Sequence, residues 1–155
     1  MLTKIPKDKE LIIFDFYGTI IYSAYSNKNL LRNGIKNLVH KLKHKGKLLV
    51  ISSDANVSDI VDDFGYASKL YFLNNFEKIY GNETIGFDKV GKSYKSYKNL
   101  GFICNEQSIL IPQAIFIGDN HQGIDEYSAN RFRMDYIIVP TENKNFSFDS
   151  LLPEC

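Results

Sequence analysis

The sequence contains no tryptophan, only two cysteines and no long apolar run. Cys104 and Cys155 have neither the number nor the spacing of a disulfide framework or a zinc site, so we expect ordinary thiols. No window approaches the roughly 20 apolar residues of a membrane span, and the charged N-terminus, Met1–Glu10, lacks an apolar stretch of signal-peptide length. We therefore expect a cytoplasmic protein that does not contact a membrane.

An excess of charge of one sign is also missing. The chain has 19 basic and 18 acidic side chains, a formal net charge of +1. No overall field draws the protein towards nucleic acid or anionic lipid, so any site for a polyanion must be local. With 155 residues, of which 44% are hydrophobic, the chain is long enough for one domain. We expect a single domain over residues 1–155.

Four short apolar runs have the pattern of strands that are buried on both faces. They are Leu11–Phe14, Leu48–Ile51, Ala114–Ile117 and Tyr136–Val139. Leu70–Leu73 is a weaker candidate for a strand.

Helical spacing of apolar residues separates these runs. Leu31–Leu42 has one apolar face and is followed by Gly46, and Val57–Phe64 has another before Gly65. Tyr94, Tyr97 and Leu100 step by threes, which predicts a short helix that ends at Gly101. A last helix is expected between residues 119 and 136, and the polar tail from Thr141 to Cys155 is expected to lie on the surface.

Alternating strands and helices with short connections predict an α/β fold. The expected architecture is a Rossmann-like, three-layer α/β/α sandwich around a mostly parallel sheet. In such sheets, ligands bind at the carboxyl ends of the strands.

Three of the predicted strands end at or next to a polar residue: Asp15, Ser52 and Asp119. These side chains should share one edge of the sheet. The backbone amides of the turn at Gly18 and Thr19 can hold phosphate oxygens. Two carboxylates on neighbouring strands repel each other unless a hard cation lies between them, and Mg²⁺ accepts such sparse carboxylate ligation.

These segments resemble the motifs of the haloacid dehalogenase superfamily. Its first motif is an apolar strand followed by Asp-x-Asp-Gly-Thr, and Asp15-Phe16-Tyr17-Gly18-Thr19 matches it except at the third position. Its second motif, a strand that ends in Ser or Thr, is similar to Leu48–Ser52, with Ser53 as the alternative. Each motif is a weak signal alone, and the resemblance depends on their order and spacing.

The third and fourth motifs follow in the same order. A lysine ahead of the helix before the last motif fits Lys89, with Lys92 as the weaker choice. Gly118-Asp119 matches the start of the fourth motif, but the expected second aspartate, Asp125, lies six positions beyond Asp119 instead of about four. If this loop is simply longer, Asp125 supports the metal site from behind.

The resemblance implies a phosphatase-type site. Asp15 would be the nucleophile, and Mg²⁺ would be held by Asp15, the backbone carbonyl of Tyr17, and Asp119. Ser52 or Ser53, Lys89 and Thr19 would bind the transferred group, and Tyr17 would occupy the position of the acid/base. The implied substrate is phosphorylated, and it is either a small molecule or a macromolecule.

Tyr17 is the departure from the family pattern. Phosphatases of the family have an aspartate there that protonates the leaving group and later activates water. A phenol with a pKa near 10 is a poor base at neutral pH, and general acid–base help is typically worth ~10²–10⁴ in rate. His121, in the loop after Asp119, could take over that role.

Two other functions stay open. Asp-x-Tyr-Gly-Thr is similar to the first motif of the 2-haloacid dehalogenases, although the interval between Thr19 and Ser52 is short for the helical cap of those enzymes. Loss of the acid/base also permits a catalytically weak protein that binds a partner or a phosphorylated ligand. A site without a cap would be open to large substrates, or would be covered by a partner or a second copy of the chain.

A cluster of lysines and tyrosines lies near the predicted site lysine. Lys92, Tyr94, Lys95, Tyr97 and Lys98 interleave bases with aromatics, as surfaces that bind single-stranded nucleic acid do. The same tyrosines have the spacing of a buried helix face, which is the structural alternative. The sequence does not exclude nucleic acid as a partner.

Overall fold

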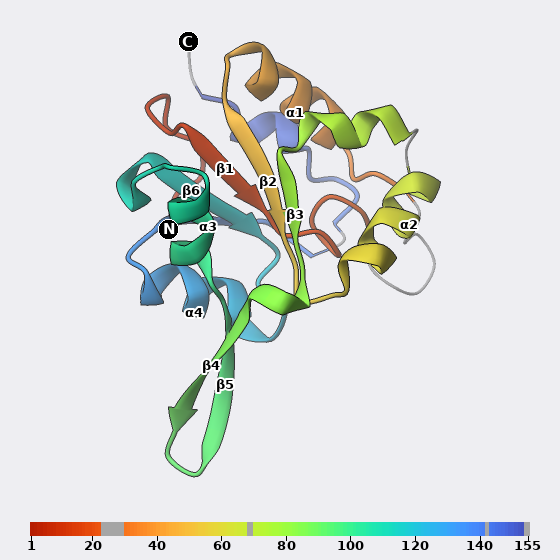
Figure 1. Cartoon of the computed structure of the whole chain (residues 1–155). Coiled ribbons are helices and arrows are strands. Elements are labelled where there is room, and N and C mark those ends of the chain that lie inside the picture. Colours follow the sequence, from red (N-terminus) through yellow and green to blue (C-terminus); the bar gives the residue numbers. More distant parts are fainter. Residues whose placement is uncertain (23–29, 68–69, 142, 154–155) are drawn as a thin grey trace.

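A computed structural model describes residues 1–22, 30–67, 70–141 and 143–153. Its main sheet has five strands in the order β3-β2-β1-β6-β7, and every pair in it is parallel (Figure 1). The strands are β1 (Leu11–Phe14), β2 (Leu48–Ser52), β3 (Lys78–Tyr80), β6 (Ala114–Gly118) and β7 (Asp135–Ile138). The four apolar runs predicted as strands are therefore confirmed, with ends that shift by one residue in β2, β6 and β7.

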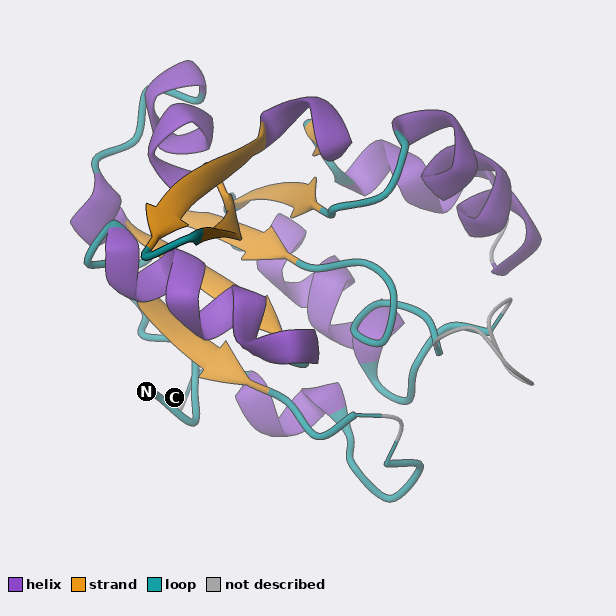
Figure 2. Cartoon of the chain, turned by 90° about the horizontal axis from the view of Figure 1, so that it is seen from below, coloured by secondary structure: helices purple, strands orange, loops and turns teal. Residues whose placement is uncertain are grey.

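The sheet is buried on both faces because helices cover each side (Figure 2). Along β1, Ile12 and Phe14 belong to one apolar cluster, while Leu11 and Ile13 belong to the other. The first cluster also includes side chains of α1 (Ile35–His44) and α2 (Val57–Ala67), and the second includes those of α3 (Leu100–Glu106) and α4 (Ile124–Arg131). The predicted three-layer Rossmann-like fold is confirmed.

The strand order creates a reversal point in the sheet. From β1 the chain first moves outward to β2 and β3, and it then returns to the other side of β1 to form β6 and β7. Ligands of open α/β sheets bind at the carboxyl ends of the strands where this reversal occurs. The reversal point here lies between β1 and β6.

A second, two-stranded sheet lies between β3 and α3 in the sequence. It is an antiparallel hairpin of β4 (Ile85–Val90) and β5 (Ser93–Lys98), and it projects from the main sheet in Figure 1. Val90 pairs with Ser93, so the connection is the two residues Gly91 and Lys92. Gly91 has φ +62°, as the first position of a tight hairpin turn requires.

The hairpin corrects one prediction of the sequence analysis. The spacing of Tyr94, Tyr97 and Leu100 predicted a helix that ends at Gly101, but Tyr94 and Tyr97 lie on β5, and the helix α3 begins only at Leu100. Spacing by threes over two turns does not distinguish a short helix from a strand that is followed by a helix. Leu70–Leu73 is likewise not a strand but part of the 3₁₀ helix η1 (Leu70–Asn75).

The tail after β7 also differs from the prediction. Within it, the 3₁₀ helix η5 (Phe148–Leu151) packs against α1, and Phe148 is fully buried in the first apolar cluster. The tail is therefore part of the core rather than a surface covering. None of the helices in the described part of the chain is long and apolar enough to cross a membrane.

We expect Phe148→Ala to destabilise the protein by about 3–5 kcal/mol, because it removes a buried aromatic ring and leaves a cavity. Urea denaturation followed by circular dichroism measures this change. Lys144→Ala, an exposed position in the same tail, is the matched control and should change the free energy of unfolding by less than about 0.5 kcal/mol. Equal stability of the two variants would contradict a core role for the tail.

Candidate active site

The site lies where β1, β2 and β6 end. Phe14 is in register with Ile51 on one side and Ile117 on the other, so the next residue of each strand reaches the same level. Asp15, Ser52 and Asp119 are all buried at this edge. The convergence of these three residues is what the sequence predicted.

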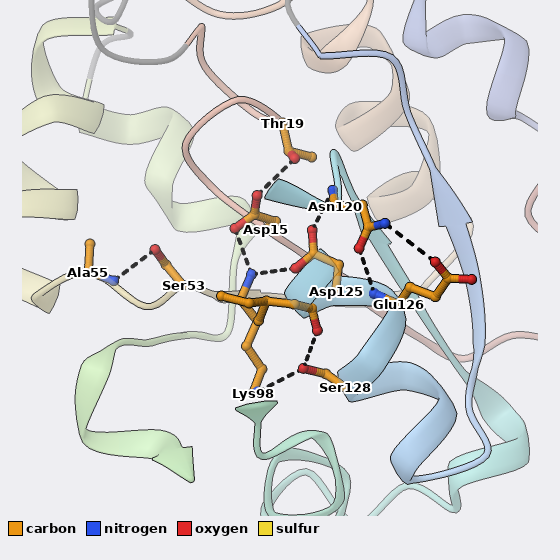
Figure 3. Close-up of polar contacts among 10 residues, drawn as sticks. Asp15, Thr19, Ser53, Ala55, Lys98, Asn120, Asp125, Glu126 and Ser128 are labelled. Carbon is orange, nitrogen blue, oxygen red and sulfur yellow. Dashed lines mark hydrogen bonds and ion pairs between the residues drawn. The ribbon is translucent and has the colours of Figure 1, made fainter. Parts of the chain in front are cut away.

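The ammonium group of Lys98 joins the two sides of the site. Its Nζ atom donates to Asp15 Oδ1 at 2.8 Å and to Asp125 Oδ1 at 2.7 Å (Figure 3). The Lys98 side chain is only 4% exposed. Its backbone amide donates to the hydroxyl of Ser128 on α4, which fixes the end of β5 against that helix.

Lys98 therefore occupies the place that the sequence analysis gave to Lys89 or Lys92. Lys89 lies on β4, exposed and paired with Tyr94, and Lys92 lies in the hairpin turn. The wrong choice follows from the wrong helix, because a helix at residues 94–100 left only upstream lysines as candidates. The alternation from Ser93 to Lys98 after a Gly91 turn was the signal for a hairpin.

Asp125 reaches Lys98 because the loop after β6 is tightly coiled. Asn120 and Gln122 both have positive φ, and residues His121–Gly123 form the 3₁₀ helix η4. The Asn120 amide donates to Asp125 Oδ2 at 2.9 Å, and the Asn120 side-chain oxygen accepts from the amide of Glu126. The longer spacing thus still brings Asp125 to the site, whereas His121 is exposed.

The charges of the site do not balance within the described chain. Burial, followed by repulsion from Asp125, raises the pKa of Asp119. Burial raises the pKa of Asp15 to about 7, although Lys98 opposes this shift. Burial alone would lower the pKa of Lys98, but Asp15 and Asp125 outweigh it and hold that pKa above its ordinary value. One ammonium serves three carboxyl groups, so the site favours a further cation.

The three carboxylates have the arrangement of a metal site. Asp15, Asp119 and Asp125 each offer an oxygen within 4.8 Å of the others. Asp119 Oδ1 is buried without a hydrogen-bond partner, whereas both oxygens of Asp125 already accept bonds. A Cβ on Gly18 would lie 2.3 Å from Asp119 Oδ2, so only glycine allows this approach. The residues fit Mg²⁺, with Asp15 and Asp119 as the available ligands.

The two serines after β2 have different surroundings. Ser52 Oγ is buried and has no hydrogen-bond partner, while Ser53 Oγ accepts from the amide of Ala55 and caps the turn. Ser52 is thus the hydroxyl that can receive a ligand. Thr19 is fully buried, and its hydroxyl donates to Asp15 Oδ2 at 3.1 Å.

The side chain of Tyr17 is directed towards α2. Its hydroxyl donates to Asp63 Oδ2 at 2.6 Å. Burial, the hydrogen bond to Asp63 and the charge of Asp63 raise the pKa of Tyr17 above its ordinary value. The phenol is therefore protonated at neutral pH and already uses its proton in a hydrogen bond.

Arg32 is a contributor that the sequence analysis missed. It is buried, and its guanidinium donates to the carbonyls of Gly18 and Pro140, each at 2.7 Å. It also lies over the ring of Phe148, 5.2 Å from the centroid. Arg32 therefore holds the turn that follows Asp15. An isolated arginine outside any motif gave no sequence signal for this role.

No protein-family model matches the chain, and no curated protein matches its sequence. Solved structures do match. A haloacid dehalogenase-like hydrolase from Streptococcus pneumoniae is 14% identical, with a TM-score of 0.64 over 94% of this chain and 90% of that one. A haloacid dehalogenase-superfamily hydrolase from Ehrlichia chaffeensis is 14% identical, with a TM-score of 0.60 over 90% of this chain and 94% of that one.

A third match is the N-terminal part of a Bacteroides fragilis protein that contains a phosphatase domain complexed with Mg. It is 18% identical, with a TM-score of 0.64 over 92% of this chain and 39% of that one. At such identities the likeness concerns the fold. The fold that the motifs implied is thereby confirmed: the chain has the haloacid dehalogenase-like fold.

Proposed function

We propose that the protein is a magnesium-dependent phosphatase-type hydrolase with Asp15 as its nucleophile. One observation carries the proposal: Asp15 lies at the reversal point of the sheet, between two buried polar atoms that lack partners. These are Ser52 Oγ and Asp119 Oδ1. A phosphoryl group would satisfy the first and a divalent cation the second, since buried polar atoms are rarely left unpaired.

In the proposed reaction, a carboxylate oxygen of Asp15 attacks phosphorus while the bond from phosphorus to the ester oxygen breaks. The alcohol leaves and takes up a proton from solvent. Water then attacks the aspartyl phosphate, which releases inorganic phosphate and regenerates the carboxylate. Lys98 neutralises charge beside Asp15, Ser52 orients the transferred group, and Thr19 holds Asp15 through its second oxygen.

Asp15, Asp119 and the backbone carbonyl of Tyr17 are the groups that we propose as protein ligands of Mg²⁺. When bound, the ion supplies positive charge at the phosphoryl oxygens. Asp125 has a different task, because its oxygens are engaged by Lys98 and the Asn120 amide. It would hold Lys98 in place and support the metal site from behind.

Tyr17 limits which substrates would react quickly. Its proton is held by Asp63, and a phenol of raised pKa neither protonates an alkoxide nor activates water at neutral pH. The activity should therefore be weak on alkyl phosphates and stronger on esters whose leaving group needs no proton. This is the specialised activity that we assign to the site.

The Tyr17–Asp63 hydrogen bond also favours a second function. A site that forms an aspartyl phosphate but hydrolyses it slowly, or that only binds a phosphorylated ligand, could serve as a regulatory or binding protein. A dehalogenase is the third alternative, because halide leaves without a proton. Halide release from 2-chloropropionate tests that reaction directly.

We expect the protein to hydrolyse para-nitrophenyl phosphate with Mg²⁺, and Asp15→Asn to reduce turnover to that of buffer. The variant retains a polar side chain of the same size but lacks the nucleophilic carboxylate. Steady-state release of nitrophenolate measures the effect. Wild-type turnover that is no higher than that of Asp15→Asn would contradict the proposed enzyme.

Ser52→Ala and Ser53→Ala form a matched pair in the same assay. Ser52→Ala should lower kcat/KM by about 100-fold, the typical cost of one lost donor to the reacting group. Ser53→Ala removes only a turn cap and should cost much less. The reverse order would show that Ser53 binds the transferred group.

We expect Mg²⁺ to raise the melting temperature, because it relieves the repulsion among three buried carboxyl groups. At a free concentration 100 times its Kd, the gain is about 2.7 kcal/mol, or about 5–10 °C for a domain of this size. Scanning fluorimetry with and without Mg²⁺ measures it. Asp119→Asn should remove most of this increment, and an increment of unchanged size would place the ion elsewhere.

The increment should be larger at pH 7.5 than at pH 5. The pKa of Asp15 is raised from 3.8 to about 7 in the folded chain, so protons occupy the site at pH 5 and compete with the ion. Without Mg²⁺ the sign is the opposite: the folded state binds these protons more tightly, so its stability falls as the pH rises from about 4 to 7.

Tyr17→Asp should raise kcat for an alkyl phosphate such as phosphoserine by about 10²–10⁴, because it restores a general acid/base. The gain on para-nitrophenyl phosphate should be far smaller, since nitrophenolate leaves without a proton. Asp63→Asn is the control, since it removes the partner of Tyr17 without adding a carboxyl group at position 17. An unchanged rate on phosphoserine in Tyr17→Asp would show that Tyr17 does not limit the site.

A further inference from the structure

The two faces of the β4–β5 hairpin differ in what they contact. Directly paired residues of an antiparallel hairpin share a face, and faces alternate along each strand. One face, which we call the anchored face, carries Asp88, Lys95 and Tyr97, since Asp88 pairs with Lys95 and Gly86 pairs with Tyr97. The other, the open face, carries Phe87, Lys89, Tyr94, Ser96 and Lys98.

The anchored face is held by α4. Asp88 accepts two hydrogen bonds from the guanidinium of Arg131 and one, at 2.6 Å, from the hydroxyl of Tyr127. Lys95 Nζ lies 4.2 Å from the centroid of the Tyr127 ring. These contacts from two positions along α4 fix the direction in which the hairpin projects, so the open face has a defined orientation.

The open face is aromatic, basic and accessible. Phe87 is 67% exposed and Tyr94 is 69% exposed. Lys89 lies directly opposite Tyr94, and Phe87 is the diagonal neighbour of Tyr94, about 7–8 Å away along the sheet. Within the described chain, the ammonium groups of Lys89 and of Lys92 in the turn make no printed ion pair or hydrogen bond, so they are available to an anion.

The open face is continuous with the site. Lys98 ends this face of β5, and its ammonium group is the one bound to Asp15. From Lys98 the hairpin extends away from the carboxyl edge of the sheet, where Figure 1 shows it projecting past the end of α4. A ligand that lies along the open face can therefore place one end at Asp15.

We propose that the open face binds single-stranded nucleic acid, with a terminal phosphate of the strand at Asp15. The position of that phosphate rests on the function proposed above, while binding to the hairpin does not. Exposed aromatic rings stack on bases of any sequence, and lysines beside them follow the phosphates of a single strand. The hairpin carries four lysines and one acidic residue, and that acidic residue, Asp88, is on the anchored face.

Two other occupants fit the open face less well. A second copy of the chain would bring Lys89 and Lys92 towards the same lysines of the first copy if the faces met symmetrically, and like charges at an interface are costly. A phosphopeptide offers one phosphate to Asp15 but no repeated negative charge for the lysines and no base for each ring. The repeated charge and flat bases of a nucleic acid match both features.

Fluorescence anisotropy with a labelled single-stranded oligothymidylate tests the proposal. The full-length protein binds the strand in Mg²⁺, and a 3′- or 5′-phosphate on the strand tightens binding. Phe87→Ala with Tyr94→Ala should weaken binding by at least about 10-fold, since each stacked base contributes about 1–3 kcal/mol, which is about 5- to 150-fold. Lys89→Ala with Lys92→Ala should reduce the slope of log K against log salt by about 1.4.

Matched controls lie on other parts of the surface. Tyr71→Ala removes an aromatic ring that is 59% exposed on η1, and Lys36→Ala with Lys41→Ala removes two exposed lysines of α1. These variants should bind the strand as the wild type does. Thermal denaturation confirms that every variant is folded, and failure of the proposed hydrolase would appear separately, as absent turnover of para-nitrophenyl phosphate in the wild type.

Three results would overturn the proposal. Unchanged strand binding in both hairpin variants would place the strand elsewhere. A phosphopeptide that binds, where the oligonucleotide does not, would assign the face to protein ligands. Light scattering that shows a wild-type dimer, broken by Phe87→Ala with Tyr94→Ala and without strand binding, would assign it to a second copy of the chain.

Discussion

The Nζ atom of Lys98 lies between two buried carboxylates, 2.8 Å from Asp15 and 2.7 Å from Asp125. Charges removed from water in this way are tolerated only when they are paired and hydrogen-bonded, and the loss of one partner leaves the others uncompensated. The end of β1, the start of α4 and the end of β5 are therefore held to one another by a single ammonium group. Because Asp119 adds a third carboxyl group, the site retains negative charge that a divalent cation can neutralise.

The turn after Asp15 depends on contacts from distant parts of the chain. Gly18 allows the close approach of Asp119, and Arg32 joins the carbonyl of Gly18 to that of Pro140. The same guanidinium lies over Phe148 in the tail. The tail thus stabilises the turn of the nucleophile as well as the core, which explains why a segment so far from the motifs is buried.

The sequence by itself determined the sheet and the convergence of its polar ends. Runs such as Leu11–Phe14 are apolar at every position, so they can only be buried on both faces, as central parallel strands are. Parallel strands end at one edge, and Asp15, Ser52 and Asp119 follow from that geometry without knowledge of any contact. The order of the motifs was enough to predict the fold, because strand order and helix placement obey few rules.

Only the tertiary structure decided which lysine meets Asp15, which serine is free and what Tyr17 contacts. Lys98 was missed because residues 93–100 fit a helix or a strand equally well, and the choice depends on cross-strand pairing with β4 and on packing against α4. The partner of Tyr17 is Asp63, on a helix 46 positions away, and no local pattern encodes that contact. Periodicity is a local property of the chain, whereas the position of a proton or a charge in this site is set by side chains that meet only when the chain has folded.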